Sequence, residues 1–229
     1  MVWFARSLFF GLVVTGLGAC SSALRWTPDT YVVQPGDTVY SIAFQYDIDK
    51  RDLMAWNRLD GNALIFVGQR LRLYEPEGYY PPPATRSSSR SSSNSSRPPP
   101  AAKGGGRVGW QWPTSGPVIT RFGATNKTRS GMHIGGKLGQ PVKAAAAGKV
   151  VYAGDSLPGY GQLLIIKHNS QYLSAYGHNQ QLLVGEGDQV SLGQSIAKMG
   201  EGPGNRPLLH FEIRRSGRPV DPLIYLPRR

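Results

Sequence analysis

The chain has 229 residues and a formal net charge of +12. That length allows one large domain or two small ones. Because the sequence contains a single cysteine, an intrachain disulfide is excluded, and any fold must be stable without one.

The first twenty residues carry a targeting signal. Arg6 supplies a positive start, and a short apolar run follows up to Leu17. A lone transmembrane helix needs about 20 apolar residues, so this shorter run is typical of the hydrophobic part of a secretory signal peptide. The tail "LGAC" resembles the lipobox of bacterial lipoproteins. The resemblance implies that residues 1–19 are removed and that Cys20 is lipidated.

Residues 20–29 are then expected to form a short lipidated tether. Ser21, and no aspartate, follows the cysteine. In enteric lipoproteins this resemblance implies transport to the inner leaflet of the outer membrane, with the protein facing the periplasm. The alternative is an ordinary cleaved signal peptide that happens to carry a cysteine.

Residues 30–75 predict a small β-α-α-β module. Tyr31–Val33 is a short run typical of a strand, and Asp37 is predicted to be the N-cap of a helix that starts at Thr38. Asp49 marks the start of a second helix. The alternation in "VGQRLRLY" predicts a returning strand.

This module resembles a LysM module over its whole length. The matching residues are Tyr31-x-Val33, Pro35-Gly36-Asp37-Thr38, Ile42-Ala43, Trp56-Asn57 and Gly68-Gln69-x-Leu71. LysM modules bind glycans that contain N-acetylglucosamine, in a groove between the loop after the first strand and the loop before the last. The resemblance implies one groove wall of Gly36, Asp37 and Thr38 and another of Ile65, Phe66, Val67 and Gly68. Gly36 and Asp37 can also be read simply as turn and cap residues, and the two interpretations are compatible.

Residues 76–109 predict a disordered linker. Pro, Ser and Gly dominate this stretch, which cannot bury enough apolar surface to fold. Trp26–Glu77 has five basic and eight acidic residues, whereas Val108–Arg229 has fourteen basic and six acidic ones. A basic domain can bind nucleic acid. After a secretion signal, however, we expect an anionic wall polymer, lipid headgroups or an acidic protein, and no nucleic acid.

Residues 110–229 predict a mainly antiparallel β domain. Short apolar runs such as "GKVVYAG", "QLLIIKH" and "LLHFEIRRSG" are separated by Gly, Asn and Ser, a pattern typical of a sandwich or barrel. The domain resembles the LytM (lysostaphin-type) zinc metallopeptidases over nearly its whole length. The matching stretches include "WPTSGPVITRFG", "GYGQLLIIKHNSQYLSAYGHN" and "LLHFEIRRSGRPVDPLIYL".

Active LytM enzymes carry His-x-Gly-x-Asp, Tyr-x-His and His-x-His, and two histidines and the aspartate hold zinc with one position open for water. Gly131 sets the register of the first motif in this chain. Arg129 then stands at the first ligand position, and a guanidinium has no lone pair to offer a metal. His133 stands at the aspartate position.

The other two motifs are kept in part. His178 is retained in "YGH", whereas the last motif has Leu208 in place of its first histidine and keeps His210, its metal-binding one. We therefore expect no catalytic residues, no bound zinc and no other cofactor. The alternative is a residual site from His133 and His210 with His178 as a third ligand, since three histidines can hold zinc. His168 is interpreted as a strand-end surface residue without a role.

A LysM module followed by a degenerate LytM domain on a lipoprotein resembles the NlpD-type proteins. These activate N-acetylmuramoyl-L-alanine amidases during cell separation, and their degenerate groove docks the amidase and displaces its self-inhibiting helix. The resemblance implies three partners: peptidoglycan glycan strands, a periplasmic amidase, and the membrane through the N-terminal lipid. The implied groove face is Arg129, His133, His178, Leu208 and His210. Two alternatives stay open, an active zinc endopeptidase of wall cross-links and a purely structural wall tether.

Overall fold

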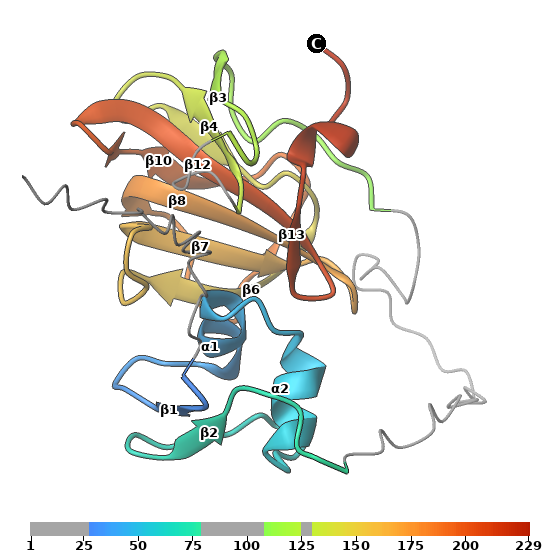
Figure 1. Ribbon diagram of the computed structural model, residues 1–229. Helices are drawn as coiled ribbons and strands as arrows, with labels where there is room; N and C mark the ends of the chain where they lie inside the picture. Colours follow the sequence, from blue (N-terminus) through green and yellow to red (C-terminus); the bar gives the residue numbers. More distant parts are fainter. Residues whose placement is uncertain (1–27, 79–107, 125–129) are drawn as a thin grey trace, which may run out of the picture.

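The computed structural model describes residues 28–78, 108–124 and 130–229 (Figure 1). The predicted signal peptide, Cys20, most of the predicted linker and Arg129 lie outside the described residues. The β-α-α-β module and the mainly antiparallel β domain are both confirmed. No helix in the described ranges is long and apolar enough to cross a bilayer.

The small module consists of β1 (Thr30–Val32), α1 (Val39–Gln45), α2 (Lys50–Trp56) and β2 (Arg70–Arg72). The two strands pair antiparallel, with Tyr31 opposite Leu71. Asp49 is the N-cap of α2, as predicted, and its side chain accepts a hydrogen bond from the Arg51 amide. The core is made of buried side chains from all four elements and the segments beside them: Val33, Val39, Ile42, Ala43, Leu53, Leu71 and Leu73.

The predicted cap of the first helix is wrong by one residue. Thr38 is the N-cap, and α1 begins after it. Thr38 Oγ1 accepts from the Ser41 amide at 3.0 Å, while Ser41 Oγ accepts from the Thr38 amide at 2.9 Å, which is a capping box. The carboxylate of Asp37 is engaged in the preceding turn, where it accepts from the Tyr31 hydroxyl and the Gln34 amide, each at 2.7 Å. Asp37 therefore shapes the turn, and Thr38 starts the helix.

The large domain is one sheet of eleven strands among the described residues, in the order β3-β4-β12-β8-β7-β6-β9 with four strands on the side of this path. The strands of the main path are β3 (Val118–Thr120), β4 (Met132–Gly135), β12 (Arg206–Arg215), β8 (Tyr172–Leu182), β7 (Gln162–Lys167), β6 (Gly148–Gly154) and β9 (Gln189–Val190). The side strands are β5 (Pro141–Lys143), β10 (Ser195–Met199), β11 (Glu201–Gly202) and β13 (Arg218–Val220). Neighbouring strands on the main path pair antiparallel.

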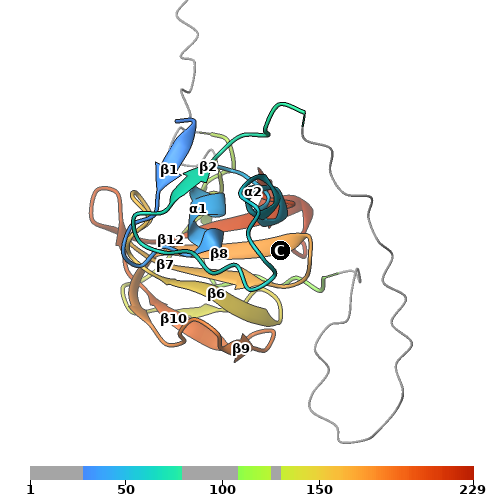
Figure 2. The same cartoon turned by 90° about the horizontal axis from the view of Figure 1, so that it is seen from below.

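Both faces of β7 are buried. Leu164 and Ile166 point into the core of the large domain, and Leu163 and Ile165 point the opposite way. On that second face they meet Phe44 of α1, so the small module covers this side of the sheet (Figures 1 and 2). The run "QLLIIK" is apolar almost throughout because a strand covered on both sides has no solvent face.

Candidate functional site

Three adjacent strands bring three histidines together. His133 in β4 is the register partner of His210 in β12, and His210 is also opposite Gly177 in β8, directly before His178. The ring centroids of His133 and His210 are 5.2 Å apart, and those of His178 lie 6.1 and 6.0 Å from the other two. The centre of the sheet thus gathers three imidazoles at one place.

These rings line a cavity of about 380 Å³. We call it the histidine groove. Its lining residues come from both domains: Gln45, Asp47, Ser130, His133, Pro158, Gly159, Tyr160, His178, Pro203, His210 and Arg214. The space is large enough for side chains of a partner protein.

His178 is held by its backbone in an unusual conformation. Its φ is +61°, which is uncommon for a residue with a side chain. The amide of His178 donates to the Tyr160 carbonyl at 2.7 Å, and its carbonyl accepts from the Gly200 amide at 2.8 Å. Burial, and secondarily the nearby His210, lowers the pKa of His178 to about 4. The ring is therefore neutral near pH 7 and can bind a partner only through uncharged hydrogen bonds and packing.

Glu212 lies behind the groove and holds His210 in place. Its Oε1 accepts from His210 Nε2 at 2.8 Å and from the Tyr160 hydroxyl at 3.0 Å, and its Oε2 accepts from Arg214 Nε at 2.8 Å. Burial alone would raise the pKa of Glu212, but the charge of Arg214 and the hydrogen bond from His210 bring it below its ordinary value. Burial likewise opposes the charge of Arg214, and Glu212 outweighs it and raises the pKa of that guanidinium. A carboxylate and a guanidinium are thus both ionised inside the protein.

This arrangement fixes the orientation of His210. Because ionised Glu212 only accepts hydrogen bonds, His210 Nε2 is the donor in this contact, and Nδ1 is the ring nitrogen that remains to face the groove. Among the residues that the structure describes, no group of three or more His, Cys, Asp or Glu side chains has an arrangement that could hold a metal ion.

The structure does not place Leu208 in the groove. Its side chain is 3% exposed, and it is not among the described residues that line the cavity. It occurs two residues before His210 in β12, but β11 folds back over it: a Cβ added to Gly202 would lie only 2.7 Å from Leu208 Cδ1. Leu208 is therefore covered by β11 in this structure, and its assignment to the groove face stays a prediction. Arg129, the remaining groove residue that was predicted, lies outside the described residues.

His168 is not a surface residue, contrary to the sequence interpretation. It is 7% exposed and packs edge-on against Trp110, with ring centroids 4.9 Å apart. Its Nδ1 donates to the Ala147 carbonyl at 2.8 Å, and its Nε2 is hydrogen-bonded to Ser174 Oγ at 2.7 Å. His168 thus joins the β6–β7 region to β8 inside the fold, away from the groove.

The two predicted glycan-binding loops adjoin each other in the small module. The Val33 carbonyl accepts from the Gly68 amide at 2.9 Å, so the second loop lies beside the chain that leads into the first. Phe66 and Val67 at its tip are 65% and 66% exposed. The other predicted wall residues are exposed or half-buried: Gly36, Asp37, Thr38, Ile65 and Gly68. The arrangement leaves two apolar side chains at the surface, ready to contact a ligand.

Sequence reasoning missed Glu212 and Arg214. A signal was present, because "HFEIRR" places a charged or polar residue at every second position after His210. In a strand, alternate residues share a face. Strand alternation therefore predicts that Glu212 and Arg214 lie on the same side as His210. Their apolar neighbours Phe211 and Ile213 fill the opposite core.

Comparison with known proteins identifies both domains. The model for the LysM domain matches residues 31–73, and the model for peptidase family M23 matches residues 127–222. Over 95% of its length the chain is 44% identical to the lipoprotein NlpD/LppB homolog of Pseudomonas aeruginosa, and the alignment covers 84% of that protein. This chain belongs to the NlpD/LppB lipoprotein family.

Other relatives of this NlpD/LppB-family lipoprotein match a smaller part of it. The murein hydrolase activator NlpD of Escherichia coli is 53% identical over 52% of this chain, and the alignment covers 32% of that protein. The outer membrane antigenic lipoprotein B of Haemophilus influenzae is 56% identical over 52% of the chain and 29% of its own length. The chain thus spans about a third of these two relatives.

Proposed function

We propose that this protein activates a periplasmic N-acetylmuramoyl-L-alanine amidase during septal wall splitting and daughter-cell separation, without hydrolysing peptidoglycan itself. The lipid on Cys20 anchors it to the inner leaflet of the outer membrane, facing the periplasm. Its LysM module holds peptidoglycan glycan strands. The second domain presents the histidine groove to the amidase.

The observation that carries this proposal is a groove whose zinc-binding pattern is interrupted. A cavity of about 380 Å³ lies beside His133, His178 and His210, whereas the sequence departs from the zinc-binding pattern at Arg129 and Leu208. A groove lined by three histidines whose ligand pattern is interrupted is suited to binding a partner, and a relative is named a murein hydrolase activator.

The test uses the full-length chain with Cys20→Ser, so that the protein is soluble without its lipid. The measurement is dye release from labelled sacculi by an amidase of the same organism, with the chain added or omitted. We expect clear stimulation, and a weaker effect from Arg129→Glu, because the reversed charge would repel an acidic contact on the partner. Arg218→Glu, an exposed charge on β13, is the matched control and should stimulate like the parent chain.

Two outcomes would favour the alternatives. No stimulation by any folded variant favours the structural tether. Dye release by the chain alone, abolished by a metal chelator, favours a zinc endopeptidase.

A further inference from the structure

The LysM module rests on the β domain through the last turn of α1. Phe44 is 3% exposed although it belongs to the small module, because its ring packs against Leu163 and Ile165 of β7 and Tyr152 of β6. It also meets the ring of Tyr160 edge-on, with centroids 5.5 Å apart. Tyr160 lines the histidine groove, so the domain contact begins at the groove wall.

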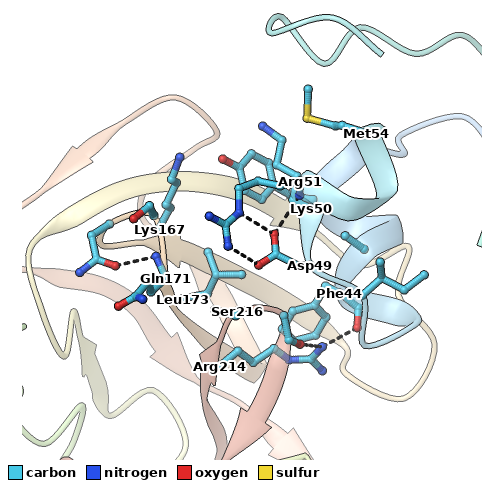
Figure 3. A pocket seen from close by; sticks show the side chains of 16 residues that line it. Phe44, Asp49, Lys50, Arg51, Met54, Lys167, Gln171, Leu173, Arg214 and Ser216 are labelled. Atoms are coloured by element: carbon cyan, nitrogen blue, oxygen red, sulfur yellow. Dashed lines mark hydrogen bonds and ion pairs between the residues drawn. The ribbon is translucent and has the colours of Figure 1, made fainter. Parts of the chain in front are cut away.

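Arg214 of β12 reaches across the same contact (Figure 3). Its Nη1 donates to the Phe44 carbonyl at 2.6 Å and lies 2.9 Å from Asp47 Oδ1. Its guanidinium carbon is 3.5 Å from the centroid of the Phe44 ring. This arginine has 1% of its surface exposed, and the small module contributes to its cover through Phe44 and Asp47.

The end of α1 is built to receive a cation. Asp47 has φ +57°, and the amides of Asp47 and Ile48 donate to the carbonyls of Phe44 and Ala43, which is the hydrogen-bond pattern of a Schellman motif. This turn directs the Asp47 carboxylate and the Phe44 carbonyl to one side. The negative end of the helix adds to their attraction for Arg214.

The contact closes one end of the groove. Gln45 and Asp47 of the small module are part of its lining. A continuous series of ion pairs and a hydrogen bond runs from Asp47 through Arg214 and Glu212 to His210, with steps of 2.9, 2.8 and 2.8 Å. The position of the LysM module and the setting of the groove histidine are therefore linked.

The contact does not fill the whole space between the two domains. A cavity of about 130 Å³ lies along the seam, lined by α1 and α2 on one side and β7 and β12 on the other (Figure 3). The two domains therefore leave a cleft along this part of the seam.

We infer that the LysM module is an intramolecular lid on the histidine groove, held shut by Arg214 and the end of α1, and that the amidase displaces it to dock. This rests on the proposed function, because it concerns access to the same groove. A partner segment that takes the place of the lid needs the same chemistry, which is an acidic side chain for Arg214 and an apolar one for the face under Phe44.

A disulfide across the seam tests the lid. A Cβ built on Gly36 would lie 3.3 Å from Ser156 Oγ, a spacing compatible with a disulfide between Gly36→Cys and Ser156→Cys. The pair is placed in the full chain with Cys20→Ser, so that no other thiol is present. We expect the two engineered cysteines to form the disulfide readily. The measurement is the number of free thiols that remain, counted with a thiol reagent. The oxidised protein should stimulate the amidase about tenfold less than the same protein treated with dithiothreitol, a typical coupling between sites.

Two substitutions, Gly36→Cys and Asp47→Asn, distinguish closure of the lid from other effects of the engineered cysteines. Gly36→Cys alone reports the strain of a side chain at φ +84° and should not respond to dithiothreitol. Asp47→Asn keeps a residue that tolerates positive φ and removes the charge that faces Arg214. It should slow oxidation of the engineered pair and stimulate the amidase several-fold more than the parent chain, the scale of a weak coupling. Asp60→Asn, at an exposed turn of the small module, is the matched control.

The remaining outcomes count against one idea or the other. If the engineered pair does not oxidise, or if its oxidised and reduced forms stimulate equally, the lid is wrong and the proposed function stands. If neither the parent chain, the reduced pair nor Asp47→Asn stimulates the amidase, the proposed function fails, and the lid fails with it.

Discussion

Arg214 Nε and Glu212 Oε2 are 2.8 Å apart on one face of β12, and neither side chain has appreciable exposed surface. Removing one partner of such a pair leaves an uncompensated charge inside the protein, which costs about 3–5 kcal/mol. We expect Arg214→Met to lower the free energy of unfolding of the full-length chain by about that amount, measured by urea denaturation.

Arg215→Met changes the neighbouring exposed arginine and should alter the free energy of unfolding by less than about 0.5 kcal/mol. Adding Glu212→Gln to Arg214→Met should recover part of the loss, because the remaining group is then uncharged. If Arg214→Met and Arg215→Met have the same free energy of unfolding, the ion pair between Arg214 and Glu212 does not contribute to stability.

His168 makes the stability depend on pH. Burial lowers the pKa of His168 to about 4 from 6.5, although the hydrogen bond to Ala147 opposes the shift. The folded chain binds the proton less readily than the unfolded chain, so stability is full above pH 6.5 and falls as the pH drops toward 4. Between pH 7 and pH 5 the loss from this residue should be about 2 kcal/mol.

The comparison that isolates this effect is wild type against His168→Gln, each unfolded with urea at pH 7 and at pH 5. Glutamine can donate to the Ala147 carbonyl and accept from Ser174, yet it does not titrate. A pH dependence that is the same in both proteins would assign it to other groups, such as His178.

Phe66 should contribute to glycan binding without contributing to the fold. Its ring is 65% exposed in the loop before β2, so Phe66→Ala should leave the melting temperature nearly unchanged. We expect the variant to co-sediment with insoluble peptidoglycan several-fold less, because an exposed ring supplies binding area to a ligand. Tyr74→Ala removes another exposed ring, 46% exposed and outside the predicted walls, and should bind like the parent. Loss of binding in both would indicate unspecific adhesion.

The full-length chain should release no peptide from peptidoglycan, even with added zinc. Arg129 replaces a ligand and Leu208 replaces a catalytic histidine, and loss of one key catalytic group commonly costs a factor of about 10² or more. Mass spectrometry of soluble products, and the zinc content of the purified protein, check this directly. Turnover that a chelator abolishes would show that His133, His178 and His210 form a working site.

Cys20→Ser should release the protein from the membrane fraction. Each buried CH₂ of an attached lipid contributes about 0.8 kcal/mol to membrane binding, and a serine variant lacks the chains that supply it. Fractionation followed by immunoblotting measures the change. If the processed serine variant still sediments with membranes, another part of the chain is the anchor.

The strands were predictable because their signal is local. "GKVVYAG" and "QLLIIKH" become β6 and β7, since short apolar runs between turn residues have few other solutions. One local error arose where neighbouring residues compete for the same role. Asp37 and Thr38 are both good caps, and only the Tyr31 hydroxyl and the Gln34 amide, which engage the aspartate, decide between them.

Only the part of the site that follows from strand alternation and family resemblance could be predicted. These put His133, His178 and His210 in one place, but they could not reveal that β11 covers Leu208, because that depends on how a hairpin folds back. His168 was misjudged for a similar reason, since Trp110 covers it from another part of the chain. The docking of α1 on β7 depends on two surfaces distant in sequence, and no local pattern specifies it.

The two-sided burial of β7 has a consequence for the second domain when it is cut free. Without the small module, Leu163, Ile165 and Tyr152 would face water, together with the charged Arg214. Each large apolar side chain that becomes exposed costs about 1.5–3 kcal/mol, so an excised domain of residues 108–229 would be less soluble than the whole chain and prone to self-association. The small module therefore also keeps the second domain soluble, because it covers this apolar face.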